Sequence, residues 1–286
     1  MDAIGLALVS AALFGAMPVA VRFALGRPVV PAASVGVLYM QLATFAILVV
    51  AADIQGGVTV DGLVPFILAG ALAPGVSHLF ITVGIREAGS SRASVAFGMA
   101  PLFAVGFAIT FFGERPGLGV LAGCFLIVGG GMALAGERDR PGHVRTIGIV
   151  YALVGAAMFA FRDNLVRHLS LETDVPSMTG GAATLASAIA VTSAFVLVRR
   201  NRVVWPPSVV ARWLLPGAMV GLSYVALFEA FYRGTVSVVA PIVGTESLWG
   251  VAFSALFLHK TESVGRRLVL GAMLVVAGGA LIAITR

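Results

Sequence analysis

Ten apolar runs, each about as long as a bilayer-spanning helix, follow one another along the chain with short polar connections. A membrane core about 30 Å thick needs roughly 20 apolar residues in helical form. The runs cover residues 4–23, 33–51, 63–83, 93–112, 118–135, 147–165, 178–198, 214–231, 237–258 and 268–284. Because backbone polar groups in lipid must bond within their own segment, each run is expected to be helical. The sequence therefore predicts an all-α integral membrane protein with ten transmembrane helices.

The balance of charged and apolar residues supports this fold class. Charged residues make up 11% of the chain and apolar residues 59%, with a mean hydropathy of +1.02. A soluble domain carries about 25% charged residues, so this chain lacks the polar surface to face water. The first apolar run has no basic residues before it and no cleavage site, and is expected to remain as a helix. We predict a multi-pass protein of the cell (inner or plasma) membrane.

Basic residues and the single cysteine exclude several other functions. Most of the 19 basic residues lie in short connections, where they set topology and contact anionic lipids. No basic stripe with interleaved aromatic residues occurs, so no nucleic-acid partner is expected. Cys124 is the only cysteine, which excludes a disulfide within the chain and a cysteine metal site. Neither a cofactor nor a metal is expected.

The two halves of the sequence repeat. The polar stretch 136–145 divides the ten runs into two groups of five. The matched segments are 11–22 (AALFGAMPVAVR) with 156–167 (AAMFAFRDNLVR), 75–78 with 221–224, and 121–131 with 269–279. They occur in the same order at a nearly constant offset, which indicates an internal repeat. A five-helix unit crosses the membrane an odd number of times, so the second copy is predicted to be inverted. The predicted units are residues 1–136 and 146–286, and inverted repeats are typical of secondary transporters.

Short motifs along this pattern carry a family resemblance. Phe14-Gly15 lies in the first run, Pro101 precedes Gly113-Glu114-Arg115, and Gly130-Gly131 lies in the next run. In this order the chain resembles the drug/metabolite transporter superfamily, EamA type, over nearly its whole length. The resemblance implies ten helices, a central cavity and alternating access. It names no substrate, because the superfamily moves amino acids, drugs, nucleotide sugars and other metabolites.

The second half departs from the family pattern at two places. Glu246-Ser247 stands where the family usually has Glu-Pro, and residues 259–262 replace the Gly-Glu-Arg turn.

Glu246 is the leading candidate for a functional residue. It lies near the middle of the run 237–258, where a carboxylate costs ~2.5–3.5 kcal/mol. An ionisable residue at that depth indicates a ligand or proton site, and a structural hydrogen-bonded carboxyl is the alternative. When the two halves are aligned, Glu246 corresponds to Ala100 of the first half, so the fold itself does not require the charge.

Arg162 is the candidate partner of Glu246, because the sixth run ends on the side where the ninth begins. If the two residues pair, an ionised Glu246 would bind the amine of a substrate and Arg162 a carboxylate. If they do not, a protonated Glu246 would exchange its proton for substrate. In the alternative, Arg162 extends to the interface while Asp163 pairs with Arg167.

Several aromatic and apolar residues are candidates for the cavity wall. His78 and Tyr224 occupy repeat-equivalent positions and are predicted to line the cavity, with interhelical hydrogen bonds as the alternative. Trp249 follows Glu246 by one turn and could cap a cation or stack on a ring. Phe14, Phe159 and Met99 are predicted to form apolar wall, with helix packing as the alternative.

Two further groups of residues receive structural predictions. The glycine pairs Gly123/Gly130 and Gly271/Gly278 are each seven residues apart, hence on one helix face, and are assigned to packing or dimerisation. Charged residues at run ends, Glu87, Glu114, Glu229, Glu262 and Arg233, are expected to be solvated rim charges.

Membrane orientation is ambiguous from sequence. The side that holds the connection between the first two runs carries 14 of the 19 basic residues. The positive-inside rule then places both termini outside, whereas the family resemblance implies termini in the cytoplasm.

We predict a secondary active transporter that exports small metabolites, such as amino acids or amphipathic amines, by alternating access. Its partners are a small-molecule substrate, the lipid bilayer and protons as a possible coupling ion; the chain acts as a monomer or homodimer. The alternatives are a flippase for undecaprenyl-type lipids and a non-transporting scaffold. An enzyme is not expected, because the sequence has no clustered acidic residues, HExxH-type metal site or Ser/His/Asp set.

Overall fold

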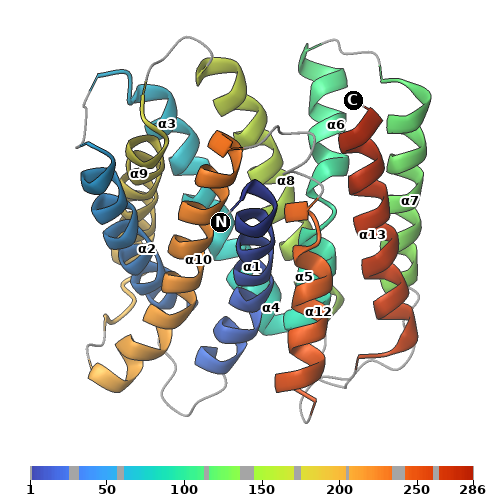
Figure 1. The fold of residues 1–286 in the computed structure, drawn as a ribbon. Coiled ribbons are helices and arrows are strands. Elements are labelled where there is room, and N and C mark those ends of the chain that lie inside the picture. Colours follow the sequence, from blue (N-terminus) through green and yellow to red (C-terminus); the bar gives the residue numbers. More distant parts are fainter. Residues whose placement is uncertain are drawn as a thin grey trace.

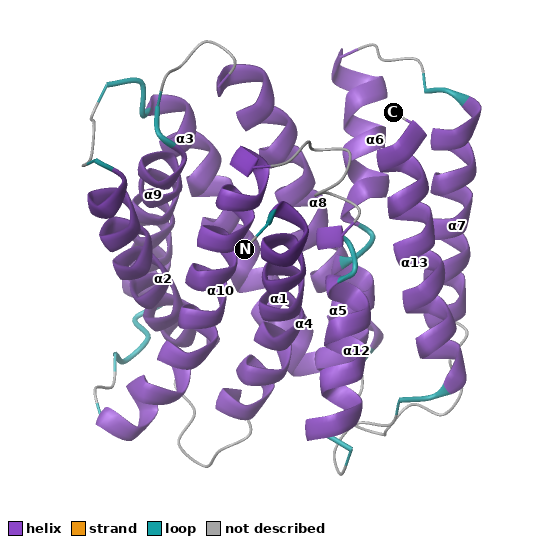
Figure 2. Ribbon diagram, in the orientation of Figure 1, coloured by secondary structure: helices purple, strands orange, loops and turns teal. Residues whose placement is uncertain are grey.

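The fold is a bundle of helices (Figure 1). A computed structural model describes residues 2–25, 32–56, 61–112, 116–135, 145–170, 175–203, 206–233, 242–259 and 264–285. The helices are α1 (Ala3–Leu25), α2 (Ala33–Gln55), α3 (Val64–Gly70), the π-helical η1 (Ala71–Val76), α4 (Ser77–Ala88), α5 (Ser90–Phe97), α6 (Ala100–Phe112), α7 (Leu118–Ala135), α8 (Thr146–Ser170), α9 (Ser177–Val198), α10 (Pro207–Arg233), α12 (Glu246–Phe257) and α13 (Arg266–Thr285). Within these ranges there is no β-strand (Figure 2).

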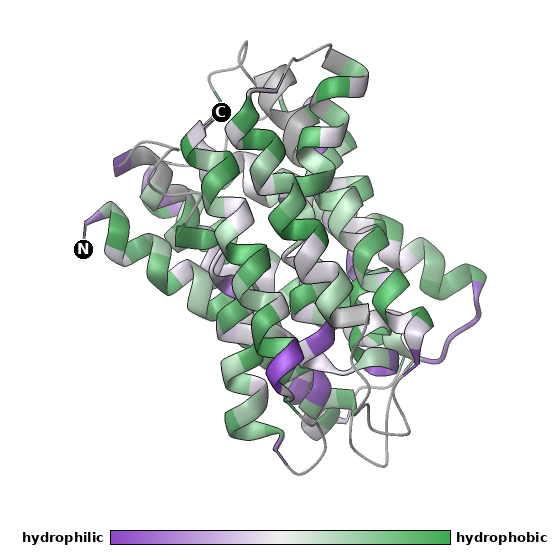
Figure 3. Cartoon of the chain, turned by 90° about the vertical axis from the view of Figure 1, so that its right-hand side faces the viewer, coloured by the Kyte–Doolittle hydropathy of each residue, from purple (hydrophilic) through white to green (hydrophobic). Residues whose placement is uncertain are grey.

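The helices confirm the predicted all-α membrane fold. Each of the ten apolar runs contains helix, and seven helical stretches in the described ranges are long and apolar enough to cross a membrane. Parts of α7 and α8, together with α12, form shorter apolar helices. Hydrophobic residues cover most of the helix lengths in Figure 3, and many of the hydrophilic segments lie at helix ends and loops. This distribution matches a lipid environment, which solvates apolar side chains but not backbone polar groups.

Helices of the two halves pair across the bundle in the way the repeat requires. Helix α1 of the first half packs on α10 of the second, and α8, the counterpart of α1, packs on α4, the counterpart of α10. The counterparts α2 and α9 pack on each other, as do α7 and α13. Each of these helix contacts between the halves is therefore matched by a contact between the counterpart helices.

Helices α1 and α8 run in opposite directions through the bundle. Near the end of α1, Arg22 contacts Arg86 at the end of α4. Arg145, directly before α8, contacts Glu87 beside Arg86. The end of α1 and the start of α8 thus lie on one face, called here the Arg22 face, toward the lower side of Figure 1. This antiparallel arrangement is that of an inverted repeat.

The third and fourth spans are broken near their middles. In the third, Ala73 leaves helical geometry (φ −140°, ψ 120°) directly before Pro74, which has no N–H to donate. In the fourth, a turn at Gly98–Met99 separates α5 from α6. Helix α6 begins at Ala100. Its repeat counterpart is Glu246, the residue at which α12 begins after a turn at residues 244–245. Glu246 is therefore the first residue of α12 and does not lie within a continuous helix, as the apolar run had suggested.

The matched glycines of α7 and α13 bring these two helices into close contact. A side chain at Gly123 would lie 2.7 Å from the Gly278 carbonyl oxygen, and one at Gly130 would lie 2.7 Å from that of Gly271. Only glycine permits this approach, so the glycine pairs act in packing within the chain.

Candidate functional site

A small cavity lies between α1, α4, α5 and α8, beside the first residue of α12. Four of the predicted residues line it, namely Phe14, His78, Phe159 and Glu246. Most of the remaining wall is apolar and includes Phe97. Both halves of the chain therefore contribute to one cavity, which fits the position expected for a site between inverted repeats.

Glu246 takes its place in the wall from the break before α12. As the first residue of that helix, it lies where the N-terminal end of the helix dipole favours negative charge. Thr245 donates its hydroxyl to the Ile242 carbonyl oxygen at 2.6 Å, which fixes the preceding turn. On the other side, a side chain at Gly15 would lie 2.7 Å from the Glu246 carbonyl oxygen. Contact with α1 thus holds the start of α12 in place.

His78 presents a polar ring in an otherwise apolar part of the wall. Its side chain is 3% exposed, and its ring centroid lies 5.7 Å from that of Phe159. Within the described part of the chain, its Nδ1 atom has no hydrogen-bond partner. Leaving a buried polar atom unbonded costs about 1–3 kcal/mol, so a group entering the cavity would gain by bonding to it.

Two aromatic contacts repeat across the halves. Phe14 of α1 packs edge-on against Tyr224 of α10, with ring centroids 5.4 Å apart and an interplanar angle of 73°. Its counterpart Phe159 of α8 packs against His78 of α4, the counterpart of Tyr224. Each half thus places one phenylalanine against the other half's aromatic residue. Tyr224 supports Phe14 and is not itself among the residues that line the cavity.

Arg162 lies beside Phe159, which lines the cavity. Its guanidinium carbon lies 4.8 Å from the centroid of the Phe159 ring, in cation–π contact. Phe97 meets the same ring edge-on, at 5.4 Å and 87°. Arg162 is not a lining residue of the cavity, and its pairing with Glu246 stays a prediction. The alternative pair of Asp163 with Arg167 lies outside the described side chains.

Trp249 and Met99 pack elsewhere in the described structure. Trp249 stacks on Phe253, with centroids 5.6 Å apart at 30°, and its Cβ atom faces Gly15. Met99 packs toward Gly131 of α7, where a side chain would meet the methionine Cε atom at 2.8 Å. Neither residue lines the cavity.

Several lining residues were missed by reasoning from sequence, Phe97 and Ser94 among them. Phe97 directly precedes the Gly98 turn, and Ser94 lies one turn earlier on α5. Ser94 donates its hydroxyl to the Ser90 carbonyl oxygen at 2.9 Å. The available signal was Gly98, because a glycine inside an apolar run can mark a break in the helix. In membrane transporters the residues beside such a break often form the binding site.

The cavity volume is about 30 Å³. A water molecule needs about 10–15 Å³ of such volume, whereas sites for drug-sized ligands occupy about 300–1,000 Å³. The cavity therefore has room for about two waters, and a metabolite enters only if helices or side chains move apart.

Comparisons with known proteins support the family resemblance. The model of the EamA-like transporter family matches residues 1–135 and again residues 146–284. A solved crystal structure shares 19% sequence identity and a TM-score of 0.67, over 98% of this chain and 95% of the other. That likeness concerns the fold alone. No curated protein matches the sequence.

Proposed function

The chain belongs to the EamA-like transporter family, and from this premise we propose that it exports small amphipathic metabolites by alternating access. Family membership supports the coarser statement that it is a multi-pass membrane transporter with a small-molecule substrate, and it points away from catalysis. The finer proposal concerns substrate, direction and coupling. It rests on one observation: a carboxyl group at a helix break faces an aromatic cavity between the halves.

The chemistry of the wall supports an amine-bearing substrate. Phe14, Phe97 and Phe159 offer aromatic surface to an apolar body, and ring faces attract cations. Glu246 supplies the opposite charge for an ammonium group. For a substrate that also carries a carboxylate, such as an amino acid, Arg162 beside Phe159 is the candidate partner.

Proton coupling would follow from the same carboxyl group. Glu246 binds either a proton or a cationic substrate. The two compete, because a protonated carboxyl group has no negative charge left to attract the cation. A proton entering from one side would then release a substrate bound from the other. His78, with its open Nδ1 atom in the same wall, would bond a polar group of the substrate or relay the proton.

The distribution of arginines supports an orientation. The Arg22 face carries Arg86 and Arg145, which lie next to the end of α4 and the start of α8. Asn201 donates to Ser34 at the start of α2, at 2.8 Å, which brings the arginines at the end of α9 to this face as well. Positively charged loops stay on the cytoplasmic side. We therefore orient the Arg22 face toward the cytoplasm, with both termini outside.

The function is tested first by untargeted mass spectrometry of medium and cytoplasm. Cells express the wild type, Glu246→Gln, Glu229→Gln or an empty vector. Glu229→Gln is the matched control, because it removes the same charge from a rim carboxylate of α10 that pairs with Arg233 at 2.7 Å. We expect wild type and Glu229→Gln to export a small set of amines, and Glu246→Gln to lose roughly tenfold or more.

Two outcomes would contradict the proposal. Equal export by Glu246→Gln would remove Glu246 from the site while leaving a transporter. Four identical cultures would contradict export and favour a lipid flippase or a scaffold. For exported compounds, proteoliposomes with an imposed pH gradient then test coupling, which the proposal expects to require Glu246.

A further inference from the structure

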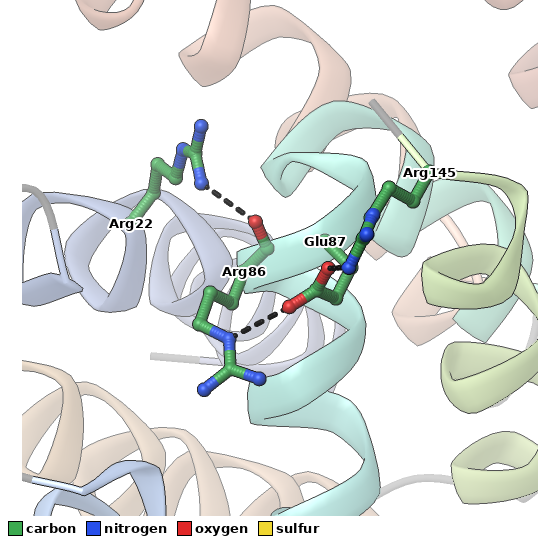
Figure 4. A network of polar contacts seen from close by, with 4 residues as sticks. All are labelled: Arg22, Arg86, Glu87 and Arg145. Carbon is green, nitrogen blue, oxygen red and sulfur yellow. Dashed lines mark hydrogen bonds and ion pairs between the residues drawn. The ribbon is translucent and has the colours of Figure 1, made fainter. Parts of the chain in front are cut away.

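The Arg22 face holds a polar network that joins three helices (Figure 4). Arg22 of α1 donates from Nη1 to the Arg86 carbonyl oxygen of α4 at 2.9 Å. Arg86 Nε contacts Glu87 Oε1 at 2.9 Å, and Arg145 Nη1 contacts Glu87 Oε2 at 3.3 Å. The backbone N–H of Arg145 also donates to the Glu87 carbonyl oxygen at 2.7 Å. The network thus includes one bond from α1 to α4, one contact within α4, and two bonds between α4 and the residue directly before α8.

The bond from Arg22 lies directly beyond the cavity. Pro18 of α1 lines the cavity, and Arg22 follows one turn later on the same helix face. On the facing helix, Ile85 lines the cavity, and Arg86 is the next residue. The Arg86 carbonyl belongs to the last turn of α4, whose carbonyl groups lack intrahelical partners and attract cations. Arg22 therefore bridges α1 and α4 at the end of the cavity nearest this face.

Helix α4 is bound closely to α8. A side chain at Gly84 would lie 2.9 Å from the Gly148 carbonyl oxygen, and one at Gly155 would lie 2.5 Å from Ile81 Cγ1. With the two bonds from Arg145 to Glu87, these contacts make α4 and α8 a tightly packed pair.

Helix α1 is bound instead to α10 and α12. Ser10 and Ser223 share a buried hydrogen bond of 2.9 Å between α1 and α10. Gly15 allows α1 to meet the backbone of α12. The boundary between these two groups of helices runs between α1 and α4, where Arg22 bridges it.

We propose that Arg22 is the gate residue that closes the cavity toward the Arg22 face. When it releases the Arg86 carbonyl, α1 separates from the α4–α8 pair and the cavity opens to that side. Glu87 and Arg145 have a different role, since they keep α4 on α8 in both states. The inference rests on the proposed transport function, because only a transporter needs its central cavity to open alternately.

Accessibility of a cysteine in the cavity tests the gate without any substrate. Met17 lines the cavity, so Met17→Cys in a Cys124→Ser background places one thiol there. Inverted and right-side-out vesicles are exposed to a membrane-impermeant maleimide, and the labelling rate is measured from each face. We expect Arg22→Gln to raise the rate from the Arg22 face about tenfold, as the loss of a charge-assisted hydrogen bond would. Arg22→Lys, which keeps the charge and an ammonium group that can donate, is expected to raise it less.

Arg145→Gln is the matched control, because it removes a guanidinium from the same network without touching the bond between α1 and α4. Its labelling rate is expected to stay within twofold of the parent. An unchanged rate in Arg22→Gln, or an equal rise in Arg145→Gln, would overturn the gate assignment. The labelling rates do not depend on Glu246. If Glu246→Gln loses export while Arg22→Gln leaves the labelling rate unchanged, the proposed function stands and only the gate assignment is wrong. A tenfold rise without export would support the gate and contradict the function.

Discussion

Substitution of Gly15 by alanine tests whether α1 positions the start of α12. An added Cβ would lie 2.5 Å from Trp249 Cβ, 2.7 Å from the Glu246 carbonyl oxygen and 2.8 Å from the Gly250 nitrogen. These atoms belong to backbone or to the root of a side chain, so none can rotate away. The three distances are roughly 0.6–0.9 Å shorter than ordinary van der Waals contact, and α12 must move by a comparable amount.

The cost follows from two opposing terms. Overpacking of a well-packed contact destabilises by about 1–3 kcal/mol, and alanine gains about 1 kcal/mol over glycine within a helix. We expect Gly15→Ala to lose up to about 2 kcal/mol net, which for a chain of this size lowers the melting temperature by up to about 8 °C. Because the first residue of α12 moves with its helix, Glu246 is displaced, and transport is expected to fall by roughly tenfold even where the protein remains folded.

Gly106→Ala provides the control for the same chemical change. Gly106 lies within α6, and an added Cβ there meets no atom of the described residues within 4 Å. Helix propensity alone then acts, so its melting temperature should equal or exceed that of the wild type. Thermal unfolding in detergent and transport in proteoliposomes measure both variants. If Gly15→Ala melts and transports like Gly106→Ala, the close contact does not position Glu246, and the site geometry argued from it is wrong.

Two further expectations concern contacts that hold the halves together. Ser10→Ala and Ser223→Ala each remove one end of the buried bond between α1 and α10, and are expected to lose about 0.5–1.5 kcal/mol. The double variant should lose less than the sum, as a double-mutant cycle of thermal unfolding would detect. Trp213→Ala removes a fully buried ring packed against Gly36, and we expect about 3–5 kcal/mol of destabilisation. A melting temperature equal to that of the wild type would contradict this packing.

The fold was predictable from sequence because its main constraint is chemical. Apolar runs of the length of a bilayer leave no alternative to helices, and the matched segments 11–22 and 156–167 indicated the inverted repeat. The breaks inside spans were not predicted. A run such as 237–258 is apolar throughout, so no periodicity marks the turn before Glu246, and hydropathy averages across it.

The candidate site was predictable only in part, for a physical reason. Glu246 stands out by its charge in an apolar run, and His78 and Phe14 by positions that repeat. Trp249 was placed by helix spacing and Met99 by its apolar character, and neither tells which face of an evenly apolar helix points inward. In the structure they pack on Phe253 and toward Gly131. The contributions of Phe97 and Ser94 depend on how the halves meet, which sequence spacing does not contain.

The symmetric and asymmetric parts of the cavity suggest a division of roles. Phe14 with Tyr224, and Phe159 with His78, form matched contacts that any inverted pair of these halves would make. Glu246 has no such match, because alanine stands at position 100 where α6 begins. In the proposed alternating access each half takes the other's place as the cavity opens to the opposite side, and matched packing would serve both arrangements. In the proposed function the substrate amine needs a single opposite charge at one place, and Glu246 at the start of α12 is the unmatched carboxyl group that would provide it.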